Sequence, residues 1–358
     1  MKFAIIPWDK NIKNDNIYLD TKLTWHVQLK EEFERQGHEF HTIDCYKGIE
    51  EVDWFLFWTL DYKWIRKVLK SAKRNRMIYC NAEPAVVRPE NSKEGYKQLC
   101  KIFVGIMTWN DSLIDNKRIY KRCIPYLFHR NYGDMPFAQR KLMVNISGNK
   151  YSNHPDELYS ERERVITYFE KNTQNEFDLF GTGWDKKIHP SYLGTVKDKS
   201  ETYHKYRFAL CLENTKDASG YLTEKLFDCL VAGIVPVYWG DPDINKFVPP
   251  TCYIDYTSFA SIEEMRNYLL NMEEITYKQY LGEIDKLLET DIQKYFTGTL
   301  LAKQMLETVE CVKKVELPEL TRMEKRRLIR AELKDSLHEI MLNLRISLKH
   351  FVIKMLRK

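Results

Sequence analysis

The sequence lacks the features that define several common protein classes. None of its 358 residues fall in an unbroken apolar run of about 18 residues, so no membrane-spanning helix is predicted. Its eight cysteines form no C-x-x-C pair and no cluster with histidine, which excludes the usual patterns of zinc ligands. Four cysteines sit within apolar or periodic runs, as buried thiols do, so we expect a reducing compartment and no structural metal. These four are Cys80, Cys100, Cys211 and Cys229.

Excess positive charge is also scarce outside the C-terminal segment. The net charge is +5, and residues 322–358 contribute +7 of it, with eleven Lys or Arg against four Asp or Glu. The first 321 residues are therefore close to neutral, at −2. Because nucleic-acid binding needs a basic surface, we expect no nucleic-acid partner for the body of the protein.

What the sequence does contain is two series of short apolar runs that alternate with helical patterns. In the first series, "FAIIPW", "VDWFLFW", "RMIYCN" and "GIMTW" are predicted strands; in the second, "LMVNIS", "FDLFGTG", "RFALCLEN" and "VPVYWG". This alternation predicts an α/β protein with two Rossmann-like domains, residues 1–140 and 141–310, and a tail at 311–358. Ligands of such sheets bind at the carboxyl ends of the strands, so we expect a cleft where the two domains face each other.

One stretch of the second series carries most of the chemical information. In "ENTKDASGYLTEKLFDCLVAGIVPVYWG", residues 213–240, a polar loop leads into a helix predicted to start near Tyr221 and to end at Gly233. Such a start would place Tyr221, Glu224 and Lys225 on one face, with Ser219 or Asp217 as the cap. Free N–H groups beside Lys225 suit a diphosphate, and Glu224 could accept hydrogen bonds from a ribose. An ordinary solvated helix face is the alternative on pattern alone.

The same stretch resembles the donor-binding motif of family 10 glycosyltransferases, the α-1,3/4-fucosyltransferases. The similarity runs from "FALCLENTKDASGYLTEKLFDCLVAGIVPVYWGDPDINKFVPP" through "CYIDYTSFASIEEMRNYL". The resemblance implies the GT-B architecture, with residues 1–140 as the acceptor domain and 141–310 as the donor domain. It also implies an inverting enzyme that transfers L-fucose from GDP-fucose to a hydroxyl group of a glycan, such as a GlcNAc-containing, surface or lipid-linked glycan.

The resemblance assigns roles to individual donor-binding residues. Tyr221, Glu224 and Lys225 fall on the family's Y-x-x-E-K, which contacts the guanosine diphosphate, with the lysine at the phosphates. Asn214 falls at the family's strand end close to the donor. The loop from Asn214 to Tyr221 is one residue longer than the family's.

Two further roles come from less similar segments. Arg164, in "RVITYF", falls on an arginine that pairs with the diphosphate, and a slightly shifted alignment selects Arg162 instead. Glu83, in "YCNAEPAV", falls on the acidic residue taken as the catalytic base. The alternative for Glu83 is an exposed acidic residue in a turn before Pro84.

The predicted chemistry needs no cofactor. A nucleoside diphosphate is a good leaving group if arginine, lysine and a helix N-terminus meet its charge, so a divalent metal ion is not required. Asp241-Pro242-Asp243 has the D-x-D spacing of a metal site, but Pro242 favours a turn. We therefore predict no metal ligand here.

The tail has an apolar stripe and many basic residues. From Leu333 to Met355 apolar residues recur at helical spacing, which predicts a basic amphipathic helix of roughly 30 residues. An anionic membrane surface, the protein's own N-terminal domain and a dimer partner are the three candidate contacts. We expect a cytoplasmic protein, peripheral on the inner face of the membrane. The alternatives for function are the same fold with another GDP-sugar, or a non-catalytic nucleotide- or glycan-binding module.

Overall fold

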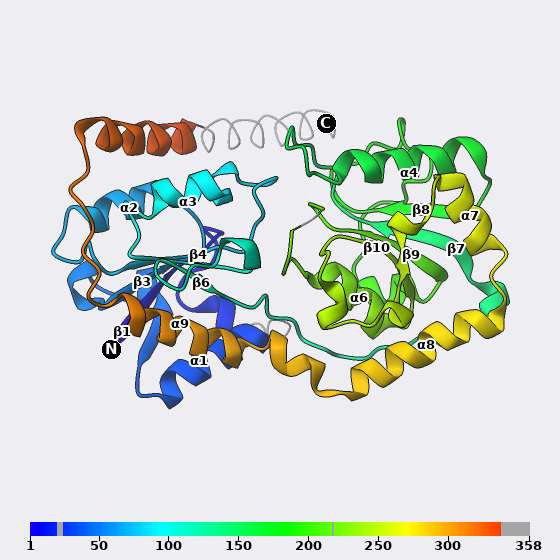
Figure 1. Ribbon diagram of the computed structural model, residues 1–358, viewed down its shortest axis with the longest axis horizontal. Coiled ribbons are helices and arrows are strands. Elements are labelled where there is room, and N and C mark those ends of the chain that lie inside the picture. The colour runs from blue at the N-terminus through cyan, green and yellow to red at the C-terminus, as the bar shows by residue number, and fades with distance from the viewer. Residues whose placement is uncertain (20–23, 217, 338–358) are drawn as a thin grey trace, which may run out of the picture.

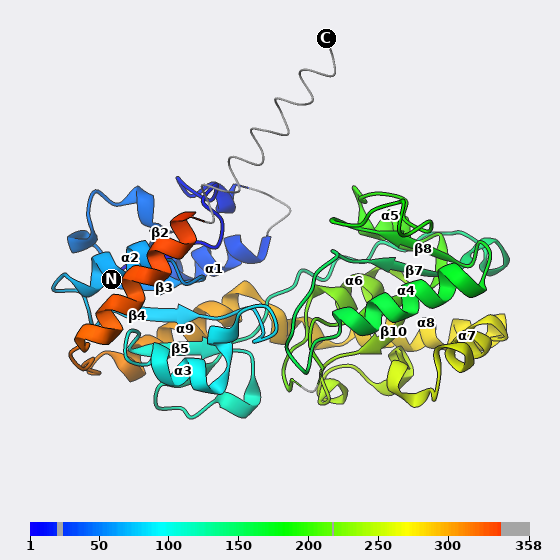
Figure 2. The ribbon, with the colours of Figure 1, turned by 90° about the horizontal axis from the view of Figure 1, so that it is seen from above.

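The protein consists of two α/β domains that lie side by side, each built on one parallel sheet (Figures 1 and 2). The computed structural model describes residues 1–19, 24–216 and 218–337. One sheet has six strands in the order β2-β1-β3-β4-β5-β6, and the other has five in the order β11-β10-β9-β7-β8. Paired strands in both sheets are parallel. The predicted pair of Rossmann-like domains is confirmed.

The first sheet is covered by helices on both faces. Its four inner strands, β1, β3, β4 and β5, are almost fully buried, as their largely apolar sequences require. Side chains of α1 pack on one face, and those of α2 and α3 pack on the other. The elements are β1 (Lys2–Ile6), α1 (Thr24–Arg35), β2 (Glu39–Thr42), β3 (Trp54–Phe57), α2 (Tyr62–Leu69), β4 (Met77–Cys80), α3 (Lys93–Leu99), β5 (Gly105–Thr108) and β6 (Ile119–Lys121).

The second sheet is also sandwiched. Helices α4 and α7 cover one face, and α5 and α6 cover the other, with α8 contributing side chains to both cores. The elements are β7 (Lys141–Ile146), α4 (Tyr159–Asn172), β8 (Phe177–Phe180), α5 (Lys199–Tyr203), β9 (Tyr206–Leu212), α6 (Glu224–Ala232), β10 (Val235–Trp239), β11 (Ile254–Asp255), α7 (Ile262–Leu270) and α8 (Glu274–Glu289).

The chain then returns to the first domain. Helix α9 (Gly298–Val312) packs against α1, and its Leu301, Met305 and Val309 belong to the core of the first sheet. The predicted donor-domain range, residues 141–310, therefore includes α9, although this helix packs on the first domain. An amphipathic pattern shows that a helix buries one face, but it does not show which sheet that face meets.

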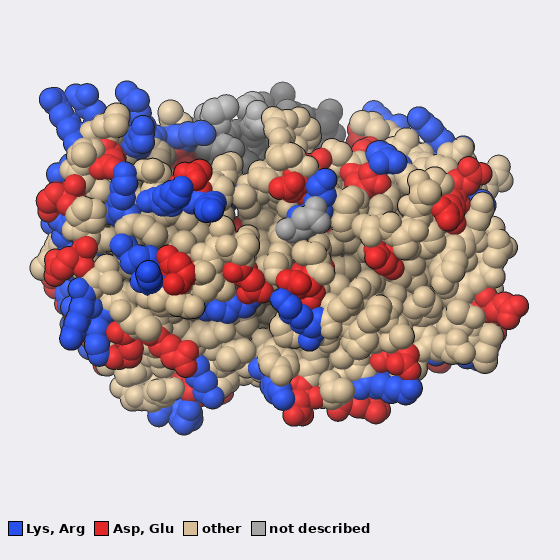
Figure 3. Space-filling model, viewed as in Figure 1, with Lys and Arg blue, Asp and Glu red and all other residues tan. Residues whose placement is uncertain are grey.

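The described part of the tail also packs on the first domain. Residues 322–337 are helical, and Leu328 is buried in the core that α2 and α3 share. Glu324 pairs with Lys101 at 2.7 Å, and Glu332 pairs with Arg66. Lys and Arg side chains gather over this helix (Figure 3). Most of the predicted stripe, residues 338–358, lies outside the described residues.

Among the described helices, none combines the length and the apolar character needed to cross a membrane.

Candidate active site

A cavity of about 460 Å³ lies between the two domains. It opens at the carboxyl ends of β4, β7, β8 and β9, where a parallel sheet is expected to bind its ligand. Glu83 lines it from the first domain, and the second domain supplies most of the polar lining. The lining includes Ser147, Gly148, Lys150, Arg162, Thr182, Lys199, Asn214, Tyr221, Thr223, Glu224 and Lys225. Five of the six predicted site residues are therefore brought together.

Helix α6 begins later than the sequence predicted. Thr223 is its N-cap, accepting a hydrogen bond from the backbone N–H of Lys225, and the first helical residue is Glu224. Tyr221 therefore precedes the helix and does not share a helical face with Glu224 and Lys225. Thr223 caps the helix in place of the predicted Ser219, and Asp217, the other predicted cap, lies outside the described residues. The predicted end is confirmed, because Gly233 adopts the left-handed conformation at the C-terminus.

A buried glutamate organises the start of this helix. Glu213, at the end of β9, has a fully buried side chain. Its carboxylate accepts hydrogen bonds from the backbone N–H of Thr223 at 3.1 Å, from the Thr223 hydroxyl at 2.8 Å and from Lys225 Nζ at 3.0 Å. Glu213 lies within the motif of residues 213–240, and no role was predicted for it. Its position directly after an apolar strand, and before a helix with Lys225 in its first turn, was the available signal.

Lys225 remains charged in this setting. Burial lowers the pKa of its ammonium group, but the carboxylates of Glu213 and Glu224 outweigh burial and leave the pKa raised. Burial raises the pKa of Glu224, but Lys225, Lys199 and hydrogen bonds to the carboxylate together lower it further, so the net shift of its pKa is downward. A stable cation at the positive N-terminal end of α6 makes this end of the cavity attractive to an anion.

The arginine of the cavity is Arg162, not Arg164. The Arg162 guanidinium is buried, and its Nη2 donates to the backbone oxygens of Leu212 at 2.7 Å and Glu213 at 3.2 Å. Its Nε has no hydrogen-bond partner among the described residues. The Arg164 side chain is 66% exposed and bonds Glu161 on the outer side of α4. Side chains two positions apart on a helix point in different directions, so only one of Arg162 and Arg164 can face the cavity.

The remaining predicted donor-side residues line the cavity as expected. Asn214 follows Glu213 and donates from Nδ2 to the Tyr221 hydroxyl at 3.2 Å. Tyr221 is buried, and its ring packs on that of Trp109 at 4.5 Å between centroids. Glu224 keeps an accessible carboxylate at the cavity wall.

Glu83 stands on the opposite wall, three residues beyond the end of β4. Its backbone is held while its side chain is exposed: Glu83 N donates to Asn81 Oδ1 at 2.9 Å, and Asn91 Nδ2 donates to the Glu83 carbonyl at 2.8 Å. Asn81 in turn bonds the hydroxyl of Tyr96 at 2.7 Å. No sequence pattern predicts this hydrogen-bond network, because its residues are spread over several elements.

The two domains meet at a tight seam beside the cavity. Trp109, directly after β5, donates from Nε1 to the Ala82 carbonyl at 3.0 Å. Asp111 N donates to the Ser219 carbonyl at 3.1 Å across the domain boundary. Gly220 has φ +88°, and a Cβ there would lie 2.4 Å from the Trp109 carbonyl oxygen. Only glycine fits this approach, so the loop before α6 is docked on the first domain.

The D-x-D sequence belongs to this seam. Asp241 accepts hydrogen bonds from Gly220 N at 3.0 Å and from Asp243 N at 2.8 Å. Burial raises the pKa of Asp241 to about 6. Asp243 accepts from the Ser219 hydroxyl and pairs with Lys246 at 2.9 Å. The two carboxylates thus hold a turn, as Pro242 suggested.

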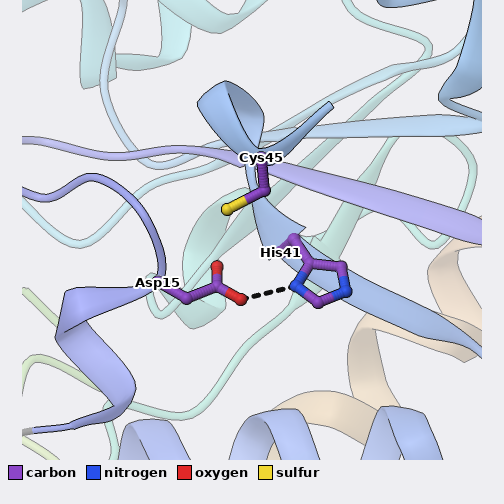
Figure 4. A group of neighbouring side chains, drawn as sticks. All are labelled: Asp15, His41 and Cys45. Atoms are coloured by element: carbon purple, nitrogen blue, oxygen red, sulfur yellow. Dashed lines mark hydrogen bonds and ion pairs between the residues drawn. The ribbon is translucent and has the colours of Figure 1, made fainter. Parts of the chain in front are cut away.

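One group of side chains elsewhere has the composition of a metal site. Asp15, His41 and Cys45 approach one another at the outer edge of the first sheet (Figure 4). His41 Nδ1 already bonds Asp15 at 2.5 Å, and Lys30 Nζ lies 3.6 Å from the same carboxylate. The Lys30 ammonium provides the positive charge that a metal ion would otherwise bring, so the group is a structural ion-pair cluster.

Comparisons with known proteins agree with this geometry. A family model described as glycosyltransferase family 10 (fucosyltransferase) C-term matches residues 139–296. An alpha-(1,4)-fucosyltransferase of Arabidopsis thaliana is 30% identical over 167 residues, 43% of this chain and 41% of that protein. An alpha-(1,3)-fucosyltransferase of Helicobacter pylori is 34% identical over 113 residues, 31% of this chain and 23% of that protein. The matches thus span less than half the length of these two curated relatives.

A structural likeness extends over most of the chain. The crystal structure of an alpha1,3-fucosyltransferase with GDP superposes with a TM-score of 0.55 at 16% sequence identity, covering 88% of this chain and 91% of that one. At this identity the likeness establishes the fold, with both domains included.

Proposed function

The chain belongs to glycosyltransferase family 10 through residues 139–296, and from this premise we propose that it transfers L-fucose from GDP-fucose to a hydroxyl group of a glycan. The observation that carries the proposal is the pairing of two walls across one cavity. An anion site at Arg162, Lys225 and the start of α6 faces an exposed carboxylate, Glu83. A sugar-nucleotide donor needs the first wall, and activation of an acceptor hydroxyl needs the second.

The diphosphate of the donor would lie at the N-terminus of α6. Lys225 and the free Nε–H of Arg162 would bind its oxygens, and the Glu224 carboxylate would accept hydrogen bonds from the ribose. Asn214 and Tyr221 would close the inner end of the site. A cavity of about 460 Å³ is within the range of small-molecule sites.

The transfer would proceed by direct displacement. The acceptor oxygen attacks the anomeric carbon of fucose while Glu83 takes the hydroxyl proton, and the bond between that carbon and the diphosphate oxygen breaks. The electron pair of the broken bond leaves with GDP, whose charge Lys225 and Arg162 stabilise. Attack from the side opposite the diphosphate inverts the anomeric centre. The sequence of events requires no cofactor and no divalent ion.

The test is turnover by a Glu83→Gln variant. We expect the rate of GDP release from GDP-fucose with an N-acetyllactosamine-type acceptor to fall at least about 100-fold, with GDP-fucose binding unchanged. Glu90→Gln is the matched control, since Glu90 is an exposed acidic residue in the same loop region but outside this cavity. Unchanged turnover in Glu83→Gln would remove Glu83 from the mechanism.

A panel of GDP-sugars separates the alternatives. Acceptor-dependent turnover with another GDP-sugar alone would reassign the donor. Tight GDP binding without turnover of any GDP-sugar over a broad set of acceptors would indicate a non-catalytic module.

The tail suggests where the enzyme works. The described helix buries Leu328 and exposes an apolar stripe of Ile329, Leu333 and Leu337 beside Arg326 and Arg330. We therefore keep the proposal of a cytoplasmic enzyme peripheral to an anionic membrane, acting on a lipid-linked or surface glycan. Co-sedimentation with phosphatidylglycerol vesicles, lost on deleting residues 322–358, tests it. A shift to a smaller oligomer on the same deletion would instead assign the stripe to a dimer contact.

A further inference from the structure

The first domain carries a stack of aromatic rings that the proposed chemistry leaves unused. The rings of Trp8 and Trp58 lie 5.4 Å apart between centroids and only 7° from parallel. The ring of Trp25 stacks on Trp58 at 5.7 Å and 11°. Three indoles from three separate segments are therefore aligned face to face.

The stack has a closed inner side and an open outer side. Trp58 is only 9% exposed, and the ring of the buried His26 packs 5.7 Å from both Trp8 and Trp58. Trp8, in contrast, is 51% exposed. Trp58 and His26 both contact the Trp8 ring, and about half of Trp8 still remains exposed. A large exposed aromatic face on a buried support is more typical of a ligand contact than of a core residue.

The stack lies on the edge of the sheet that faces the cavity. Trp8 follows β1, Trp58 follows β3, Glu83 follows β4 and Trp109 follows β5, and these four strands are consecutive neighbours in the sheet. Glu83 lines the cavity and Trp109 contacts Tyr221 of the second domain, so this carboxyl edge faces the cleft (Figure 2). Neighbouring strands are about 4.8 Å apart, which puts β1 roughly 10 Å from β4.

Along this carboxyl edge of the first sheet, the donor wall and the indole stack lie on opposite sides of Glu83. On one side of Glu83 lie Trp109 and the donor wall, and on the other lie Trp58 and then Trp8. An acceptor whose hydroxyl reaches Glu83 would extend its neighbouring residue away from the donor, toward the indoles. The C–H face of a pyranose ring is apolar and slightly positive, and it is attracted to the negative face of an indole.

From this arrangement we propose that Trp8, supported by Trp58 and Trp25, is a stacking platform for a sugar ring of the acceptor, adjacent to the residue that receives fucose. The inference rests on the proposed function for the identity of the acceptor as a glycan. It predicts that the protein binds oligosaccharide acceptors more tightly than monosaccharide acceptors.

The test is a kinetic series with Trp8→Ala and Trp8→Phe. N-acetylglucosamine and N-acetyllactosamine-type oligosaccharides of increasing length serve as acceptors. We expect Trp8→Ala to raise the KM for the oligosaccharides about five- to tenfold, to leave the KM for the monosaccharide and for GDP-fucose within about twofold, and to be rescued by Trp8→Phe. Tyr268→Ala is the matched control, because Tyr268 is an exposed aromatic residue on α7, outside this edge.

Two results would overturn the platform. One is an unchanged oligosaccharide KM in Trp8→Ala. The other is an equal rise for the monosaccharide or for GDP-fucose, which would show a general structural effect. Absence of any wild-type turnover would count against the proposed function, and the platform is then tested by binding alone. Titration of the oligosaccharides against wild type and Trp8→Ala by calorimetry should still show weaker binding to the variant, and equal binding would exclude the platform.

Discussion

The two walls of the cleft are built in different ways. The wall from the second domain buries the charges of Glu213 and Arg162 and most of Lys225, and it pairs them with groups of one segment, residues 212–225. The wall from the first domain presents the exposed side chain of Glu83 on a turn that Asn81 and Asn91 hold in place, and the exposed Trp8 lies farther along the same edge of the sheet. The difference follows from the proposed chemistry. Stabilising a departing diphosphate needs buried, fixed charges, whereas binding a variable acceptor and exchanging a proton need access.

The largest expected effect is on the donor wall, at Arg162. Arg162→Ala removes the buried guanidinium that lines the proposed diphosphate site, so we expect kcat/KM for GDP-fucose to fall about 100- to 1000-fold. Arg164→Ala should stay within about twofold, because Arg164 points outward from the same helix. Steady-state kinetics of the two variants decide the assignment. A large loss in Arg164→Ala with none in Arg162→Ala would reverse it.

The donor wall was also the more predictable of the two. Four of its residues, Asn214, Tyr221, Glu224 and Lys225, occupy one continuous motif and could be placed in the cavity from sequence alone, whereas Arg162 lies outside that motif and Arg164 was predicted in its place. The errors there concern geometry. A helical wheel drawn from Tyr221 cannot show that the buried Glu213 carboxylate binds the N–H and the hydroxyl of Thr223, which makes Thr223 the cap and moves the helix start by three residues.

The second prediction tests how the buried charges depend on each other. Lys225→Met leaves the Glu213 carboxylate buried without its cation, so the free energy of unfolding should fall by about 3 kcal/mol. Adding Glu213→Gln should recover a large part of that loss but not GDP binding. Urea denaturation and GDP titration of the single and double variants measure the two quantities. If the double variant is no more stable than Lys225→Met, Glu213 is not stabilised mainly by Lys225.

The acceptor wall was less predictable for a physical reason. Glu83 was found only through its likeness to a family position, because a lone acidic residue before a proline has no distinctive pattern. Asn81, Asn91 and Tyr96 hold its turn through buried hydrogen bonds, and no local pattern connects them. The same limit applies to α9, whose pattern identifies a helix but not the sheet that buries it.

The third prediction tests the support of the first domain by the tail. Leu328 is buried against the side of α2 and α3, so Leu328→Ala should lower the free energy of unfolding by about 2 kcal/mol. Leu333→Ala, at a residue that is 57% exposed on the same helix, should change it by less than about 0.5 kcal/mol. Thermal or urea unfolding measures both. Equal effects would mean that the tail does not pack through the Leu328 face.

The smallest expected effect lies at the seam that joins the two walls. Burial raises the pKa of Asp241 to about 6, well above the ordinary range of an aspartate. The folded state therefore binds this proton more tightly than the unfolded state does, and its contribution to stability is present at low pH and lost as the pH rises from about 4 to 6. In that window the free energy of unfolding of the wild type should fall relative to Asp241→Asn by about 1 kcal/mol per pH unit.

Asp243→Asn is the control. Ser219 and Lys246 lower the pKa of Asp243, so its contribution to stability is lost only as the pH falls. Since Asp241 binds Gly220, which touches Trp109 of the first domain, a pH slope that disappears in Asp241→Asn alone would place the titration at the contact between the two walls.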